Sequence, residues 1–303
     1  MKLGELGEER LLARLLPSLS IHDGGVLAAA GDDCAVVAAP SGGNLLLLKT
    51  DCVVGKVHFK PTADPVQVGW KAMMRPVSDF AAMSGMPQFA LITLIVPSRT
   101  TKEWVEKIYR GLNRAAAKFD ISVVGGETSS TGGPAVISVS VTGFVEKNRW
   151  VSRRGGKAGD DLFVTGRLGG ASKGKHLRFV PRIEESRWLT KKFPVHAMID
   201  LSDGLGADLP RLAEASRLGF QIEQDKLPRN PQANLENAIS DGEDYELLFA
   251  VSPRQSRELQ MAWRKKFPKL LLTRIGRFTQ PSTGASPART NHQLLRSGYV
   301  HFQ

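Results

Sequence analysis

The sequence predicts a mixed α/β protein of two domains, each of which combines strands with helices. The chain has 303 residues, which is about twice the length of a common domain. Strand-like and helical segments alternate through its first half, and a stretch rich in Arg, Gly and Lys over residues 147–160 interrupts this pattern. We therefore predict an N-terminal domain over residues 1–147 and a C-terminal domain over residues 148–303.

Four segments of the N-terminal domain have the pattern of strands. Residues 45–54, 90–96, 121–124 and 135–145 are short apolar or alternating runs bounded by Gly, Pro, Asn or Asp. Between the second and third, residues 102–119 carry apolar side chains at helical spacing and predict an amphipathic helix. Residues 66–84 predict a second helix. Helices that alternate with strands in this way are expected to cover one face of a sheet.

The C-terminal domain is expected to begin with a strand over residues 161–165. Residues 207–218 then predict a helix, 245–251 a buried strand and 255–267 an exposed helix. Residues 281–289 contain Pro, Gly, Ser and Thr and predict a loop or turn.

Composition restricts the class of protein. With 42% hydrophobic and 23% charged residues, the chain can bury a full core. The longest apolar runs fall far short of the roughly 20 residues that a membrane helix needs. The first 17 residues mix charges with leucines, unlike a secretory signal. We therefore expect no membrane span and a cytoplasmic location. Cys34 and Cys52, the only cysteines, are expected to pack in the core.

The formal net charge of +11 favours anionic partners, such as nucleotides, phosphorylated metabolites or nucleic acid. Basic residues cluster over 173–187 and 264–269, but these clusters lack the aromatic residues and the motifs of a nucleic-acid-binding module. They are therefore expected to form a solvated basic surface, and a nucleic-acid partner is not expected.

Five acidic clusters lie beside glycines or at strand ends, where ligands bind. Mg²⁺ prefers a few carboxylates together with substrate phosphates, and phosphoryl transfer depends mainly on positioning and charge neutralisation. Each cluster alone is also compatible with a turn or a helix cap. A GxxxxGK[ST] loop is absent from the sequence, which disfavours a P-loop kinase. The clusters are Gly31-Asp32-Asp33, Thr50-Asp51, Ser78-Asp79, the run 125–128 and the run 200–204.

These clusters occur within a series of longer motifs. In order they are GDDCAV at 31–36, KTDCVVGKVHF at 49–59, SDFAAM at 78–83, GGET at 125–128, AMIDLSDGL at 197–205, GEDYELLF at 242–249 and GYVHF at 298–302. With these motifs the sequence resembles the thiamine-monophosphate kinase family, which belongs to a wider group of ATP-binding enzymes resembling aminoimidazole ribonucleotide synthetase. The resemblance extends over nearly the whole chain.

The resemblance implies a two-domain α+β fold with a mixed sheet in the N-terminal domain. It also implies a homodimer in which the N-terminal strands of two chains pair into a barrel. The implied reaction is the in-line transfer of the γ-phosphoryl group of ATP to thiamine monophosphate, which gives thiamine diphosphate and ADP. ATP is then a co-substrate, several Mg²⁺ ions are cofactors, and no catalytic protein nucleophile is expected.

The resemblance further assigns roles to individual residues. The implied metal ligands are Asp33, Lys49 through its backbone carbonyl, Thr50, Asp51, Asp79, Glu127, Asp200 and Asp203. The implied nucleotide contacts are Tyr109, Gly126, Glu127, Arg153 and Ser202. The implied contacts to thiamine monophosphate are His58, Glu243 and Tyr299. These residue types suit the roles, since arginine can donate two hydrogen bonds to one phosphate and an aromatic ring can stack on a heterocycle.

Two alternatives remain open at this point. Glu127 stands where the family typically has aspartate, and its carboxylate extends one methylene further, whereas Mg²⁺ tolerates little geometric error. The stretches 169–196 and 221–240 are also shorter than is usual in the family, which would remodel the substrate wall. The chain could therefore be a related ATP-using enzyme that acts on another small substrate. It could also be a nucleotide-binding paralogue with weakened catalysis.

Overall fold

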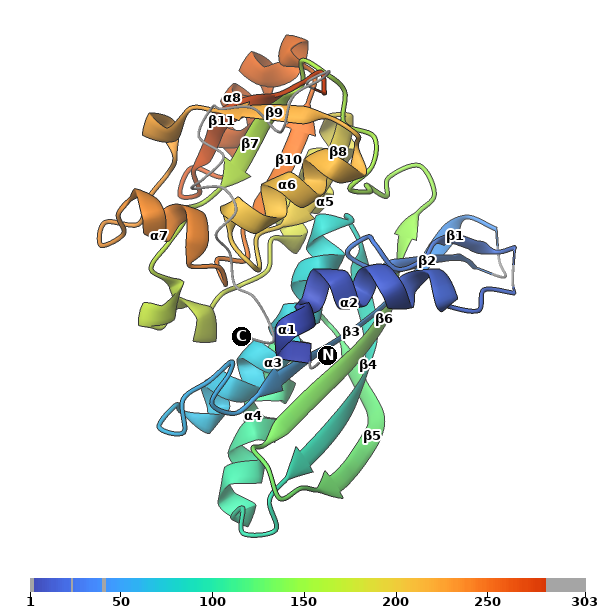
Figure 1. The fold of residues 1–303 in the computed structure, drawn as a ribbon, viewed down its shortest axis with the longest axis vertical. Coiled ribbons are helices and arrows are strands. Elements are labelled where there is room, and N and C mark those ends of the chain that lie inside the picture. Colours follow the sequence, from blue (N-terminus) through green and yellow to red (C-terminus); the bar gives the residue numbers. More distant parts are fainter. Residues whose placement is uncertain (1–2, 23, 40–41, 282–303) are drawn as a thin grey trace.

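The computed structural model describes residues 3–22, 24–39 and 42–281. These residues form two sheet-containing halves that lie one above the other in Figure 1, with helix α3 (Pro65–Ala82) between them. Residues 147–160, which connect the halves, contain no helix or strand. Within the described ranges, no helix is both long and apolar enough to cross a membrane.

The N-terminal half contains a six-stranded sheet. Only β4 and β5 run parallel, and helix α4 (Lys102–Lys118) makes the crossover between them, as a parallel pair requires. The remaining neighbours are antiparallel. In sheet order the strands are β1 (Val26–Ala28), β2 (Ala35–Ala38), β3 (Asn44–Val54), β6 (Val136–Glu146), β4 (Met86–Val96) and β5 (Ser122–Ser130).

The four strands and two helices expected in this half are confirmed, with small shifts at their ends. Strand β5 continues to Ser130, six residues beyond the predicted end at residue 124, although its last part has no apolar alternation. It is an exposed edge strand held by backbone pairing with β4. Strands β1 and β2 were not predicted, because they are only three and four residues long.

Helices α3 and α4 cover one face of this sheet and approach each other closely. Helix α3 begins after Asp64, whose side chain accepts a hydrogen bond from the Val66 N–H. A Cβ added at Gly111 would lie 2.0 Å from the Val66 carbonyl oxygen, and one added at Gly69 would lie 2.1 Å from the Ile108 carbonyl oxygen. Glycine is therefore required at both positions of this helix crossing.

The C-terminal half contains a five-stranded antiparallel sheet. Helices α6 (Leu205–Ala215) and α7 (Leu235–Ser240) pack on one face, and α5 (Ile183–Lys192) and α8 (Pro253–Lys266) pack on the other. In sheet order the strands are β8 (Val195–Asp200), β10 (Leu247–Val251), β7 (Asp161–Thr165), β11 (Leu272–Thr279) and β9 (Gly219–Ile222).

The expected strands β7 and β10 and the expected helices α6 and α8 are present in this half. The prediction that α8 is exposed was wrong in part, because Leu259 and Trp263 on one side of it are buried against the sheet. Apart from Pro281, the turn expected over residues 281–289 lies outside the described residues.

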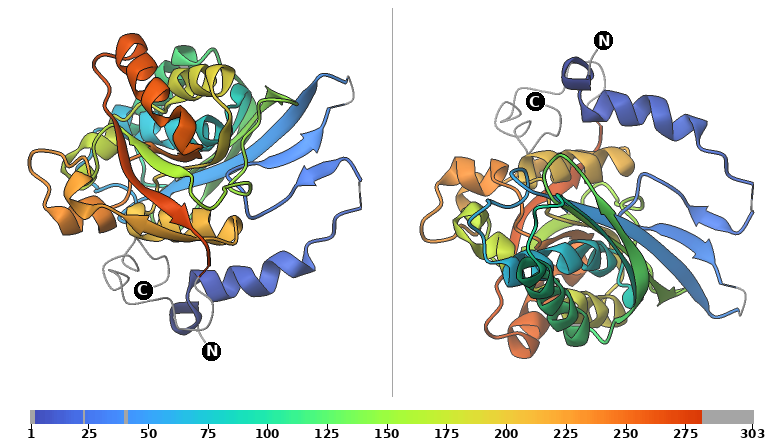
Figure 2. Two further views of the ribbon diagram at one scale, coloured as in Figure 1. Left: turned by 90° about the horizontal axis from the view of Figure 1, so that it is seen from above. Right: turned by 90° about the horizontal axis from the view of Figure 1, so that it is seen from below.

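Short helical segments complete the structure. Helices α1 (Leu3–Leu6) and α2 (Glu8–Leu15) precede the first sheet, and α2 lies at the periphery of the molecule in both views of Figure 2. Four 3₁₀ turns cover Leu16–Ser18, Ala171–Lys173, Lys175–Leu177 and Gln224–Lys226.

Helix α3 belongs to both hydrophobic cores. Its residues Met73 and Val77 are fully buried in the N-terminal core, whereas Ala81 and Ala82 pack into the core beneath α5 and α8. In the opposite direction, Phe179 and Tyr245 from the C-terminal half stack on each other, with ring centroids 3.7 Å apart, within the N-terminal core. The two halves are therefore joined by continuous apolar packing.

Candidate active site

A cavity of about 350 Å³ lies where α3 and β3 meet the loop between β8 and α6. Helix α2 also contributes to its wall. Charged side chains of both signs dominate the lining. The lining residues are Glu8, Leu12, Lys49, Asp51, Arg75, Asp79, Arg153, Asp200, Ser202, Asp203, Asp208, Arg211 and Tyr245.

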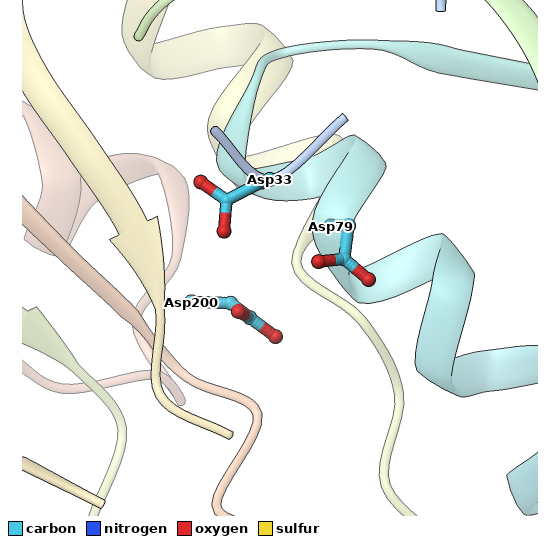
Figure 3. A group of neighbouring side chains, drawn as sticks. All are labelled: Asp33, Asp79 and Asp200. Carbon is cyan, nitrogen blue, oxygen red and sulfur yellow. The ribbon is translucent and has the colours of Figure 1, made fainter. Parts of the chain in front are cut away.

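Three buried aspartates converge beside this cavity. Asp33 comes from the loop before β2, Asp79 from α3 and Asp200 from the end of β8. One carboxylate oxygen of each lies within 4.8 Å of the others, and Figure 3 shows the three carboxylates turned toward one another. Oxygen atoms of this kind are the ligands that Mg²⁺ prefers, so the group fits a divalent cation.

The surroundings of these aspartates also favour a bound cation. Burial, with a further contribution from the charge of Asp33, raises the pKa of Asp200 to about 7. Burial also raises the pKa of Asp79 well above its ordinary value, in spite of the nearby ammonium group of Lys49. Asp33 Oδ2 is buried and has no hydrogen-bond partner among the described residues. Charging these groups together is unfavourable unless a cation compensates them.

Basic side chains form ion pairs with the acidic groups around the cavity. These side chains have the charge and the hydrogen-bond donors that a polyphosphate requires, and they stand beside the group of carboxylates that fits a metal ion. The pairs are Lys49 Nζ with Asp79 Oδ1 at 2.6 Å, Arg75 with Asp51 at 3.2 Å, Arg153 with Asp33 at 2.6 Å, and Arg211 with Asp203 at 2.5 Å.

A second polar cluster surrounds Glu243. The fully buried Lys71 Nζ donates to the His58 carbonyl oxygen at 2.7 Å and to a carboxylate oxygen of Glu243, and it lies 2.8 Å from His176 Nδ1. His176 Nδ1 is also 2.9 Å from Glu243 Oε2. Burial alone would raise the pKa of Glu243, but the hydrogen bond from His176 and the charge of Lys71 lower it to about 2. Glu243 therefore carries a negative charge at neutral pH.

The backbone around Glu243 is strained. Glu243 and Tyr245 have φ angles of 54° and 51°, in the left-handed region that L-residues with side chains rarely adopt. Such conformations concentrate at functional sites, where the surrounding contacts hold them in place. Here the contacts are the ion pair of Glu243 with Lys71 and the stacking of Tyr245 on Phe179.

The structure brings most of the implied site residues into these two regions. His58 and Glu243 belong to the second cluster. Asp33 is one of the three converging aspartates. The implied residues that line the cavity are Lys49, Asp51, Asp79, Arg153, Asp200, Ser202 and Asp203. Lys49 approaches the carboxylates through its ammonium group.

The other implied residues lie elsewhere. Thr50 is exposed, and its hydroxyl accepts a hydrogen bond from Ser140 on β6. Tyr109 on α4 is half-buried against the N-terminal core. Gly126 and Glu127 lie on the exposed strand β5 and do not line the cavity. Tyr299 lies outside the described residues.

Strand pairing gives the separation between Gly126 and the cavity. Asp51 on β3 pairs with Val139, Val139 with Ile92, and Ile92 with Gly126. Gly126 is therefore three strands away from Asp51 in one row of the sheet, roughly 14 Å at the usual strand spacing.

Several residues of these clusters were not predicted from the sequence. Lys71 and Arg75 precede Asp79 at intervals of four residues, which places the three on one face of α3. That spacing is visible in the sequence and could have revealed them. No comparable signal marks His176, because its contact with Glu243 joins distant segments. Asp208 and Arg211 lie on α6 and contact the nearby Asp203, so their proximity to the acidic motif was visible in the sequence.

Comparison with known proteins is consistent with these observations. The model of the N-terminal domain of AIR synthase related proteins matches residues 31–145, and the model of their C-terminal domain matches residues 147–285. A thiamine-monophosphate kinase from Rhodopirellula baltica is 38% identical over 75% of this chain and 76% of its own. The enzyme of that name from Aquifex aeolicus is 34% identical, with 100% of each chain covered.

Solved structures with a similar fold include a member of the same family. A structure described as AaThiL complexed with AMPPCP and TMP superposes with a TM-score of 0.80 and 32% identity, and the match covers 99% of each chain. A complex of HypE with HypF gives a TM-score of 0.71 at 19% identity, over 89% of this chain and 93% of the other, which shows a common fold alone. The two-domain α+β architecture is thereby confirmed.

Proposed function

Because the chain belongs to the thiamine-monophosphate kinase family, we propose that it transfers the γ-phosphoryl group of ATP to thiamine monophosphate. The products are thiamine diphosphate and ADP. The observation that carries the proposal is the convergence of Asp33, Asp79 and Asp200 beside a cavity that is lined by basic side chains. A metal site and a polyphosphate site stand side by side there, as phosphoryl transfer requires.

The metal ligands in this proposal are Asp33, Asp79 and Asp200, with Asp51 and Asp203 at the edge of the group. When bound there, Mg²⁺ ions would neutralise the phosphate oxygens and lower the barrier to nucleophilic attack. The unpartnered Asp33 Oδ2 and the raised pKa of Asp200 support this assignment, since a bound cation would satisfy the first and favour the charged form of the second.

The chain's own contribution is to position the phosphates. A phosphate oxygen of thiamine monophosphate attacks the γ-phosphorus, and the bond from that phosphorus to the bridging oxygen breaks in line, which releases ADP. Arg75, Arg153 and Arg211 reach the cavity from three different segments and can donate to phosphate oxygens. Each now binds an aspartate, and a bound metal ion would release these arginines toward the nucleotide.

Glu243 is proposed to bind the organic part of thiamine monophosphate. Its carboxylate remains charged, with a pKa of about 2, and a negative group is suited to the cationic thiazolium ring. His58 lies next to it, linked through Lys71. The contacts assigned to Tyr299, Tyr109, Gly126 and Glu127 remain part of the proposal.

We further propose that two chains pair through the N-terminal sheet. The face opposite α3 and α4 carries exposed apolar side chains, among them Leu48 at 37%, Phe89 at 43% and Leu91 at 51% exposure. Glu127 pairs with Thr93, between the inward-facing Ile92 and Leu94, so the alternation of a strand places Glu127 on this same outward face. A second copy packed there would cover the apolar patch and meet Glu127.

The dimer is tested by size-exclusion chromatography with light scattering. Leu91→Lys is expected to give a monomer, because a charge would be buried in the interface. Met261→Lys is the matched control, since Met261 is also an exposed apolar residue, at 59%, but lies on α8 in the other half. A wild-type protein that stays monomeric at all concentrations would refute the pairing.

Turnover tests the proposed reaction directly. The purified protein is incubated with ATP, Mg²⁺ and thiamine monophosphate, and thiamine diphosphate is measured by chromatography. Asp51→Asn is expected to lose product formation, whereas Glu236→Gln, at an exposed site on α7, is expected to retain it. If the folded wild-type protein binds ATP but forms no product, the substrate is another small molecule or the chain only binds nucleotide.

Two further assignments complete the proposal. Residues 1–147 form the domain that carries most of the metal ligands and the dimer contact, and residues 148–303 form the second domain. The reaction is proposed to take place in the cytoplasm.

A further inference from the structure

Lys49 and Arg153 each bind one of the three converging aspartates, and Lys49 does so through a compact ammonium group. Its ammonium group lies 2.6 Å from Asp79 Oδ1, which places a fixed positive charge directly on one of the three converging aspartates. The side chain of Asp79 is 9% exposed and that of Lys49 is 24% exposed, so the pair is largely shielded from water yet open to the cavity.

The position of Lys49 on β3 explains this contact. Along the strand, Leu45, Leu47 and Val53 are buried on the side of α3. Lys49 and Asp51 lie an even number of residues from these three, so their side chains point to the same side of the strand. Two ion pairs therefore connect β3 to α3. Lys49 on β3 pairs with Asp79 on α3, and Asp51 on β3 pairs with Arg75 on α3.

The hydrogen bonds of the three aspartates show how many oxygens remain for a metal ion. Asp33 Oδ1 accepts from Arg153, Asp79 Oδ1 from Lys49, and Asp200 Oδ2 from Ser78. One oxygen of each carboxylate is therefore already engaged, and the other is left for a cation. Three such oxygens, completed by water and phosphate, suit one octahedral Mg²⁺ ion.

A second divalent ion between Asp79 and Asp51 would have to displace Lys49. Both acids already face a cation, since Lys49 binds Asp79 and Arg75 binds Asp51. An ammonium group carries three N–H donors and can therefore contact a carboxylate and a phosphate oxygen at once. The position next to the three aspartates is thus filled by the protein itself.

We propose that the Lys49 ammonium group is a built-in cation of the phosphate site, which holds Asp79 and donates to a phosphate oxygen of the bound nucleotide in place of one divalent ion. The inference rests on the proposed function, because it assumes a nucleotide in this cavity. It predicts that the enzyme uses one divalent ion fewer than its carboxylates could hold.

The test counts metal ions without turnover. Free Mn²⁺ is measured by electron paramagnetic resonance during titration of the wild type, Lys49→Met and Lys49→Arg, each with and without a non-hydrolysable ATP analogue. Methionine keeps most of the length of the lysine side chain and removes its charge, whereas arginine keeps the charge. Thermal unfolding verifies that each variant is folded, and Lys49→Gln replaces Lys49→Met if the latter does not fold.

The expected result is one additional Mn²⁺ per chain in Lys49→Met and the wild-type number in Lys49→Arg. The affinity for the non-hydrolysable ATP analogue is expected to fall about tenfold in Lys49→Met, because one charge-assisted hydrogen bond to phosphate is lost. Equal Mn²⁺ numbers in all three proteins, or equal changes in both variants, would overturn the inference.

These outcomes are independent of the proposed reaction. A wild-type protein without kinase activity, combined with an extra ion in Lys49→Met, would refute the reaction and keep the assignment of Lys49. An active wild-type protein with unchanged Mn²⁺ numbers in Lys49→Met would do the reverse.

Discussion

Asp200, one of the three aspartates of the candidate metal site, lowers the stability of the folded protein at neutral pH. Its pKa is about 7 in the folded chain, against an ordinary value of 3.8, because burial disfavours its charged form. Between these two values the folded state binds a proton that the unfolded state does not. The contribution of Asp200 to stability therefore falls as the pH rises from about 4 to 7. A metal ion bound above pH 7 would offset that loss.

Asp200→Asn is expected to stabilise the metal-free protein at pH 8, since the amide carries no charge to bury. The thermal midpoint in EDTA should rise by an amount on the order of 5 °C at pH 8, and the gain should shrink at pH 5, where Asp200 is protonated. Thermal scans of both proteins at the two pH values measure this. An equal gain at both pH values would contradict the assigned pKa. Turnover is expected to be lost.

Glu243→Gln is expected to weaken the binding of thiamine monophosphate. The glutamine keeps the shape but removes the negative charge that Lys71 and His176 hold in place. A lost charge-assisted contact corresponds to a KM increase of roughly tenfold or more, with a smaller change in kcat. Steady-state kinetics separate the two, with Glu236→Gln as the control. A fall in kcat at constant KM would remove Glu243 from substrate binding.

Helix α3 is the element on which the site depends. Lys71, Arg75 and Asp79 follow one another at intervals of four residues, so a single helix face supplies groups to both polar clusters. The contact of α3 with α4 fixes the position of this face. Two glycines at that contact let the two helix backbones approach closely. Packing far from the cavity therefore decides the geometry inside it.

Gly111→Ala is expected to destabilise the protein by about 1–3 kcal/mol through overpacking. The added methyl group would lie 2.0 Å from the Val66 carbonyl oxygen, so the helices would have to separate. Gly132→Ala is the matched control, because a Cβ there meets no atom within 4 Å. Urea denaturation of both variants measures the difference. Equal stability of the two would show that the helices can move apart at little cost.

The molecule as a whole is held together by contacts that cross between its halves. Ala81 and Ala82 of α3 pack into the C-terminal core, and Phe179 and Tyr245 pack into the N-terminal one. Arg187 on α5 adds an ion pair to Glu146 at the end of β6, at 2.5 Å. Each half buries residues in the hydrophobic core of the other, so we expect the two halves to unfold together.

A fragment of residues 1–147 is therefore expected not to fold stably. It would expose the end of α3 and leave the buried Lys71 without Glu243. Circular dichroism should show a broad, non-cooperative melt for the fragment and a single transition for the full chain. A cooperative melt of the fragment at the midpoint of the full chain would establish two independent domains.

The sequence by itself determined the elements that have a local signal. Strand β3 and helix α4 follow from the alternation and the helical spacing of their apolar residues, because each buries one face. The acidic motifs and their order identified the residues able to bind metal and phosphate. Short or exposed strands such as β1, β2 and the end of β5 gave no such signal, since backbone pairing with neighbours holds them.

Only the tertiary structure decided which of these residues meet. The packing of α3 between the two halves brings Asp79 to Asp33 and Asp200, and it places Lys71 against Glu243, which is 172 residues later in the chain. The contact of Lys49 with Asp79 also depends on this packing. Charge interactions of this kind act through space and leave no periodic pattern, so the sequence supplied the groups and the fold supplied their partners.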